Sequence, residues 1–203
     1  MAYPTVDAPY GFRPVNLIGG RQYAGSTRMI PIASGHGTAI FYGDVVIMSS
    51  NGCINNATLT ATTVNVAGIF LGCSYVNSNG QRVYSQYFPA STTGTLDSPT
   101  MIESYIADDP LIVMKTAIVS ATTTISGRTR DFVGENAAIV FNAGSTVTGD
   151  GKGAISSAGA ATTTLPLRVV DVVGETRNAS GSFTEVLVMW NPTIHMYTTA
   201  AGV

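Results

Sequence analysis

Short runs of β-branched and aromatic residues, broken every few positions by Gly, Asn, Ser or Pro, dominate this sequence. Such runs are typical of β-strands, because branched and ring side chains pack well on a pleated sheet and the intervening residues form turns. Asn51-Gly52 and Asn79-Gly80 each separate two runs and favour type I′ hairpin turns, with positive φ at both central residues. Ser180-Gly181 is a weaker third case, and Asp108-Asp109-Pro110 predicts a tight turn.

The sequence therefore predicts an all-β fold, a β-barrel or β-sandwich with at most one short helix. Residues 185–190 are nearly all apolar, which favours a central strand buried on both faces with Trp190 as its anchor. Residues 129–141 carry apolar side chains at approximately helical spacing, but Gly134 and the β-branched residues weaken a helix, so both outcomes stay open. The side chains expected in the interior are Val46, Ile69, Phe70, Leu71, Ile112, Val188 and Trp190.

Two segments do not fit the strand pattern. Residues 1–28 combine several Pro and Gly residues with aromatic and Arg side chains, which predicts an extended arm lying on a neighbouring subunit. Residues 29–203 are then a single β-rich domain that should fold without the arm. Residues 142–164, mostly Gly, Ser, Thr and Ala, predict a long surface loop or a flexible hairpin. The arm residues expected at an interface are Tyr3, Tyr10, Phe12, Arg13, Arg21, Tyr23 and Arg28.

Charged residues make up only 11% of the chain and the net charge is −2. High hydrophobicity with low net charge excludes intrinsic disorder, and ten basic residues give no basic face for nucleic acid. The longest apolar runs are far shorter than the roughly 20 residues that a spanning helix needs, so no membrane partner is expected, and the N-terminus does not resemble a signal peptide. So little surface charge indicates that much of the surface is covered by other subunits.

No residue pattern indicates catalysis, and neither enzyme activity nor a cofactor is predicted. His36 is expected in a solvent-facing turn, and His195 is expected to pack or hydrogen-bond locally rather than bind a metal. Cys53 and Cys73 are interpreted as small buried side chains, with a disulfide between neighbouring strands as the alternative. The Asp108-Asp109 pair suits a turn better than a calcium site.

Several short segments, taken in chain order, resemble virion proteins of tailed bacteriophages thought to be capsid decoration (cement) proteins. They are Tyr10-Gly-Phe-Arg-Pro-Val15, residues 38–46, residues 66–75, Asp108-Asp-Pro110, Val133-Gly-Glu-Asn136, and residues 165–173 before 186–195. Residues 43–46, followed by a hairpin and residues 66–69, are similar to the barrel of small phage head-decoration proteins.

This resemblance implies a protein made in the host bacterial cytoplasm that binds the capsid exterior. There it would stabilise contacts between major capsid protein subunits, as a homotrimer or a dimer. The chain is short for a major capsid protein, which favours cement over shell. The alternative is a tail or host-recognition β-module that binds carbohydrate through exposed aromatic side chains such as Tyr84, Tyr87 and Phe88. The competing interpretation of these three is alternate core and surface positions on one strand.

Overall fold

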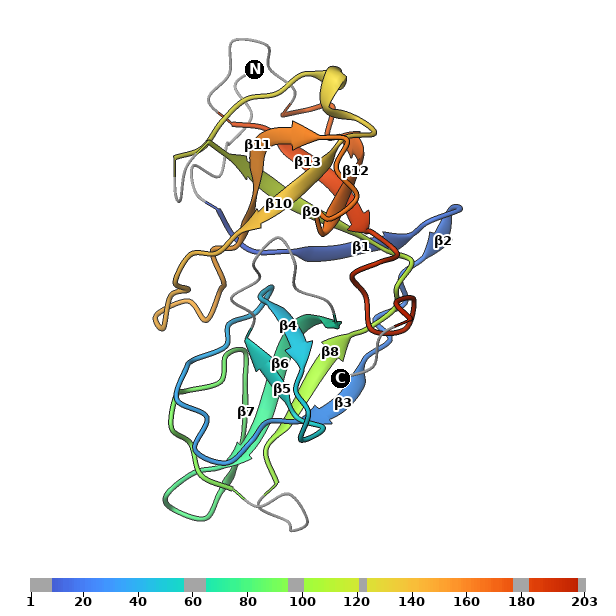
Figure 1. Ribbon diagram of the computed structural model, residues 1–203. Coiled ribbons are helices and arrows are strands. Elements are labelled where there is room, and N and C mark those ends of the chain that lie inside the picture. Colours follow the sequence, from blue (N-terminus) through green and yellow to red (C-terminus); the bar gives the residue numbers. More distant parts are fainter. Residues whose placement is uncertain (1–8, 57–64, 95–100, 121–123, 177–182, 201–203) are drawn as a thin grey trace.

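The computed structural model describes residues 9–56, 65–94, 101–120, 124–176 and 183–200, which form two β-sheets placed one above the other (Figure 1). Helical structure in these residues is limited to one 3-10 turn, Arg130–Phe132. None of the described helical structure is long and apolar enough to cross a membrane. The prediction of an all-β fold is confirmed.

The first sheet closes into a barrel. Its strand order is β11-β10-β12-β13-β9-β1-β2, and β11 also pairs in parallel with β9, so β9 to β13 form a closed ring of five strands. Closure removes the free edges that an open sheet exposes. The strands are β1 (Arg13–Leu17), β2 (Arg21–Gln22), β9 (Ile112–Val119), β10 (Asn136–Val140), β11 (Ala154–Ala160), β12 (Leu167–Val172) and β13 (Glu185–Trp190).

The second sheet has the order β3-β8-β6-β4-β5, and β7 pairs with the C-terminal half of β6 on the edge opposite β8. All of its strand pairs are antiparallel, and one isolated bridge between Ile32 and Ile54 joins its two ends. The sheet thus curls around its own core but is closed by a single residue pair. The strands are β3 (Arg28–Pro31), β4 (Val45–Met48), β5 (Ile54–Asn56), β6 (Val66–Val76), β7 (Arg82–Ser85) and β8 (Glu103–Ala107).

Both Asn-Gly pairs lie in hairpin turns, as predicted, but the turn type differs. In each hairpin only the Gly has positive φ, 75° at both Gly52 and Gly80, and its N–H donates to the carbonyl three residues earlier. This is a type I turn followed by a left-handed Gly, a common longer hairpin connection, rather than type I′. The Ser180-Gly181 pair lies outside the described residues.

The buried side chains form two hydrophobic clusters, a barrel core that also takes in Ile69 and other residues of the second sheet, and a second core within the second sheet. The barrel core contains Trp190, Val188, Ile112 and Ile69, and the second core contains Phe70 and Val46, all buried as predicted. Leu71 is the exception, because it is only partly buried against the barrel core. Strand β13 coincides with the predicted central strand at residues 185–190 and lies between β12 and β9.

Residues 129–141 do not form a helix. The 3-10 turn buries Phe132, and the chain then enters β10, which pairs with β11 and β12. The φ of Gly134 is 91°, a left-handed conformation that ends helical geometry and redirects the chain into the strand. The apparent helical spacing arises because apolar residues of the 3-10 turn, before Gly134, are counted together with apolar residues of β10, after it.

Residues 142–164 are not one continuous loop: residues 154–160 form β11, which pairs with β10 as a hairpin, in line with the hairpin alternative, and closes the barrel against β9. The small side chains of β11 give no pattern of alternating apolar residues, so the sequence does not indicate a strand there. They are required by crowding: a Cβ added at Gly159 would lie 2.6 Å from the buried Phe132 ring. Small residues at this position let the five-stranded barrel close around its large side chains.

Residues 9–28 are extended, but they are built into their own chain. Strand β1 pairs with β9 along the underside of the barrel, and Phe12 is 1% exposed within the barrel core (Figure 1). Removal of residues 1–28 would delete this strand and this ring, so the core is no longer expected to fold without them.

Candidate functional site

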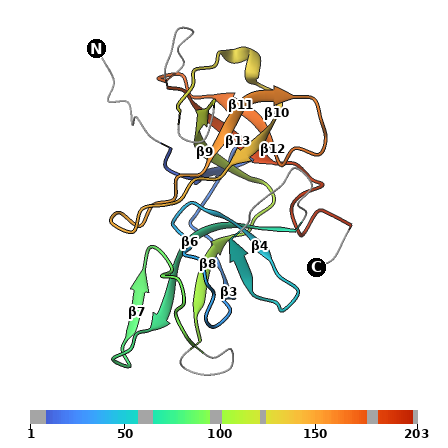
Figure 2. The same cartoon turned by 60° about the vertical axis from the view of Figure 1, so that its left-hand side comes forward.

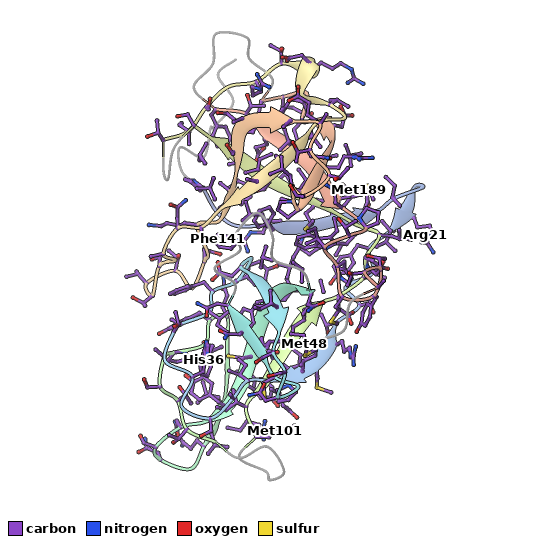
Figure 3. The ribbon with its side chains drawn as sticks, viewed as in Figure 1. Arg21, His36, Met48, Met101, Phe141 and Met189 are labelled. Atoms are coloured by element: carbon purple, nitrogen blue, oxygen red, sulfur yellow. The ribbon has the colours of Figure 1, made fainter. Side chains whose placement is uncertain are left out.

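The structure divides the predicted interface residues into two groups. Tyr10, Phe12 and Arg13 lie where the barrel meets the second sheet, whereas Arg21, Tyr23 and Arg28 lie at the opposite end of β1 or beyond it. Tyr3 lies outside the described residues. Figure 3 shows Arg21 at the end of the projecting hairpin and Phe141 between the two sheets. Residues 9–28 thus contribute to two candidate sites, one at the junction of the two sheets and one beside the projecting hairpin.

Arg13 is the centre of the first group. Its Nη2 lies 2.6 Å from the Asp150 carboxylate, and its guanidinium stacks 4.2 Å from the centre of the Tyr42 ring. Gln86 Nε2 donates to the same carboxylate at 2.9 Å. Asp150 comes from the barrel connection, whereas Tyr42 and Gln86 belong to the second sheet's segments. The cluster therefore fastens the two sheets to each other.

Tyr10 extends this cluster onto the barrel wall. Its hydroxyl donates to Glu185 Oε1, and Lys115 Nζ lies 3.0 Å from the same oxygen. Burial, and next the bond to Glu185, raise the pKa of the Tyr10 hydroxyl above its ordinary value. Tyr10 is thus a neutral donor that satisfies a nearly buried carboxylate, which is a structural role.

The connection between β10 and β11 acts as a strap across the junction of the two sheets (Figure 2). The Tyr42 N–H donates to Gly149 O at 3.0 Å, and the Gly151 N–H donates back to Tyr42 O at 2.8 Å. A side chain at Gly144 would strike the Phe41 ring, and one at Gly151 would strike Asp44, so glycine is needed for this close approach. At the tip of the strap Val147 is 93% exposed.

A cavity of about 390 Å³ lies behind the strap. Phe12, Phe41 and Phe141 line it together with Asp44. Asp44 Oδ2 accepts the Phe41 N–H at 2.9 Å, and burial raises the pKa of this carboxyl to about 6 despite the opposing effect of Arg13. An aromatic cavity with one carboxyl close to neutrality at pH 6 is more sensitive to pH than an ordinary surface aspartate.

The second candidate site is the waist groove, defined here as the hollow of about 410 Å³ between the β1–β2 hairpin, the β8–β9 turn and the C-terminal segment. Tyr23, Asp108 and Tyr197 line it. The Tyr197 hydroxyl donates to Asp108 Oδ2 at 2.9 Å, and Arg28 lies 3.6 Å from the same oxygen. Burial raises the pKa of Asp108, and the nearby Arg28 opposes this.

The Asp108-Asp109-Pro110 segment forms the predicted turn. Asp109 Oδ1 accepts the Leu111 N–H at 2.8 Å, and the Asp109 carbonyl accepts the Ile112 N–H at 3.2 Å. The Asp108 carboxylate is engaged by Arg28 and Tyr197 as described above. Across the described ranges, no group of three or more His, Cys, Asp or Glu residues could hold a metal ion.

The histidines and cysteines take largely structural positions. His36 is half-buried rather than solvent-facing, with Nε2 3.2 Å from Asn56 Oδ1. His195 is fully buried and packs locally as predicted, with its ring 6.2 Å from Trp190, and burial lowers its pKa to about 4. Cys53 and Cys73 are both buried and free, which confirms the interpretation as small core residues.

The three aromatic residues suggested for carbohydrate binding, Tyr84, Tyr87 and Phe88, differ in how exposed they are. Tyr84 lies on β7 and is 72% exposed, Tyr87 stacks on Phe41 at 5.6 Å, and Phe88 is fully buried. Only Tyr84 is therefore available as an open aromatic surface. The chain matches no protein-family model, no curated protein and no solved structure.

Proposed function

We propose that this protein is a capsid decoration (cement) protein that binds the outside of a phage head and stabilises contacts between major capsid protein subunits. The observation that carries this proposal is the β1–β2 hairpin, which projects from the waist with Arg21 and Gln22 exposed and lies next to the waist groove (Figure 1). A projecting strand edge beside a groove lined by Tyr and Asp supports subunit association, because edges offer unpaired backbone groups and Tyr anchors interfaces.

The small number of charges supports the same role. With 22 charged residues in 203, association must rely mainly on apolar area and backbone hydrogen bonds. A closed ring around a local symmetry axis repeats each contact, and a homotrimer is the preferred assembly with a dimer as the alternative. Several modest contacts made together give strong attachment.

Heating particles tests the proposal. Particles that carry the protein should release their contents at a higher temperature than particles stripped of it, and adding the purified protein back should restore the difference. Equal release temperatures would reject the cement role. Counting copies separates the alternative, because hundreds per particle indicate a capsid protein and a few to a few dozen indicate a tail module.

Variants of the hairpin sharpen this test. Replacing Arg21 and Gln22 together by Ala should reduce attachment without unfolding the chain, because both side chains are exposed. Arg130→Ala is the matched control, since Arg130 is exposed on the barrel far from the hairpin in sequence. Attachment should survive moderate salt and chelators, whereas a calcium-bridged cement would dissociate in EDTA.

A further inference from the structure

The outer face of the second sheet carries a hollow of about 540 Å³. It extends over β6, β7 and β8, and tyrosines from three separate segments border it: Tyr42, Tyr84 and Tyr105. Tyr84 is 72% exposed, and the other two are partly exposed. We call this feature the tyrosine hollow. It is separate from the waist groove, with which it shares no lining residue.

Gly72 opens the floor of the hollow. It is paired with Tyr105 in the β6–β8 ladder, directly after an irregularity in register between Phe70 and Gly72. Its φ is 142°, and an added Cβ would lie 3.0 Å from the Ser85 carbonyl oxygen. Gly72 therefore lines the hollow without a side chain, at a position where a Cβ would press on the Ser85 carbonyl oxygen of the neighbouring strand β7.

Arg82, Glu103 and Ser74 do not line the hollow but lie beside it on β7, β8 and β6, and they form a polar rim without net charge. On the same face, Arg82 and Glu103 form an ion pair at 3.2 Å, and Ser74 hydrogen-bonds to both. Tyr42, Tyr84 and Tyr105 each contribute a hydroxyl-bearing side chain to the lining of the hollow. Three tyrosine hydroxyls and a neutral ion pair therefore offer both donors and acceptors to a ligand.

This chemistry selects one class of ligand. Nucleic acids and anionic ligands require uncompensated basic groups, and the Arg on this rim is paired with a carboxylate. A neutral pyranose matches the hollow, because its C–H face packs on a tyrosine ring and its hydroxyls exchange hydrogen bonds with the rim. Tyrosines also supply contact area at a low cost in conformational entropy.

We propose that the tyrosine hollow binds a neutral, β-linked pyranose oligosaccharide. A β-1,4-linked chain is extended and exposes C–H groups on both ring faces, which suits an open hollow bordered by more than one tyrosine. The site does not depend on the cement role. Met29 pairs with Tyr105 across β3 and β8, so the two side chains lie on the same face of the sheet. Arg28, the neighbour of Met29 on β3, points to the opposite face. Arg28 and the tyrosine hollow therefore lie on different faces of the second sheet.

An NMR titration of the isotope-labelled full chain tests this site. The probes are cellohexaose and chitohexaose, each raised to about 10 mM so that affinities in the millimolar range are detected. We expect at least one probe to shift the backbone amides of β6, β7 and β8. No shift with either probe, or shifts confined to other strands, would overturn the proposal.

Three variants identify the contacts. Tyr84→Ala should weaken binding about tenfold or more, whereas Tyr84→Phe, which keeps the ring, should weaken it by less. Arg130→Ala, at an exposed position of the barrel, is the control outside the hollow and should bind like the natural chain. Because Tyr84 is exposed, its replacement should leave the far-UV spectrum unchanged. Binding that persists unchanged in a folded Tyr84→Ala variant would overturn the proposal, and it would leave the particle-heating test of the cement role unaffected.

Discussion

The two sheets solve the same packing problem in different ways. The barrel closes through a strand pair, β11 with β9, and encloses Trp190 and Phe132. The second sheet is joined at its ends by the single bridge between Ile32 and Ile54, and β7 pairs only with β6. Closure favours stability because backbone groups are paired around the ring. The second sheet carries the tyrosine hollow on its outer face, over β6, β7 and β8.

The junction between the two sheets is held by side chains from both of them. Arg13, Asp150 and Tyr42 join a barrel strand, the strap and a segment of the second sheet. Asp44 and His195 also lie at or near this junction, since Asp44 faces the strap and His195 pairs with Val66 at the start of β6. The two sheets should therefore respond together to changes at the junction.

The largest effect is expected in the barrel core. Trp190→Ala should lower the free energy of unfolding by about 3–5 kcal/mol, because the ring is 2% exposed and its loss leaves a cavity. Urea unfolding followed by far-UV circular dichroism measures this. Val147→Ala is the surface control and should change stability by less than about 0.5 kcal/mol. A Trp190 variant as stable as the natural chain would contradict the burial of this ring.

Acidification should weaken the junction through His195. Its pKa in the folded chain is about 4, below the ordinary 6.5, because burial disfavours the charged form. The contribution of neutral His195 to the free energy of unfolding is fully present above pH 6.5 and is lost as the pH falls towards 4. At 1.36 kcal/mol per pKa unit, this loss amounts to about 2–3 kcal/mol. Unfolding measured from pH 4 to 7 should show this loss, and His195→Gln should remove it. An unchanged profile in this variant would assign the loss to other groups.

The second sheet should be most sensitive at Gly68 on its central strand β6. The φ of Gly68 is 147°, and a Cβ there would strike the Ala107 carbonyl oxygen of β8. Gly68→Ala should therefore cost about 1–3 kcal/mol or more. Gly37→Ala is the matched control, because a Cβ added there would meet nothing within 4 Å and the φ of Gly37 is not in the left-handed range. Equal melting temperatures for the two variants would contradict this difference.

Ionisation of Asp44 should make the free energy of unfolding fall as the pH rises, which is the opposite of the effect of His195. Burial raises the pKa of Asp44 from 3.8 to about 6, so its contribution is fully present below pH 3.8 and is lost as the pH rises through 6. Asp44→Asn should remove this loss and stabilise the chain by about 1–3 kcal/mol at pH 8, with part of the gain cancelled by the missing attraction to Arg13. Thermal unfolding of both proteins at pH 4.5 and 8 measures the difference. A variant that is less stable than the natural chain at pH 8 would contradict it.

The smallest effect is expected for the ion pair between Arg13 and Asp150. Their side chains are 22% and 37% exposed, so a double-mutant cycle with Arg13→Met and Asp150→Asn should give a coupling of about 0.5–1 kcal/mol. The more exposed Arg130–Asp171 pair is the control and should couple more weakly. Tryptophan fluorescence follows the barrel and circular dichroism follows both sheets, so separated transitions in the double variant would show that the pair couples the two sheets.

The sequence by itself determined the strand class, the Asn-Gly hairpins, the central strand at 185–190 and nearly all of the expected core, because these depend on local propensity and hydrophobicity. It did not determine β11, since a strand of small residues carries no hydrophobic alternation and is recognised only against the Phe132 ring that it accommodates. The sequence likewise did not determine the burial of Phe12 or the pairing of Arg13 with Asp150, which lie 137 positions apart. Contacts over such separations are fixed by how the sheets close on each other, and only the tertiary structure decided them.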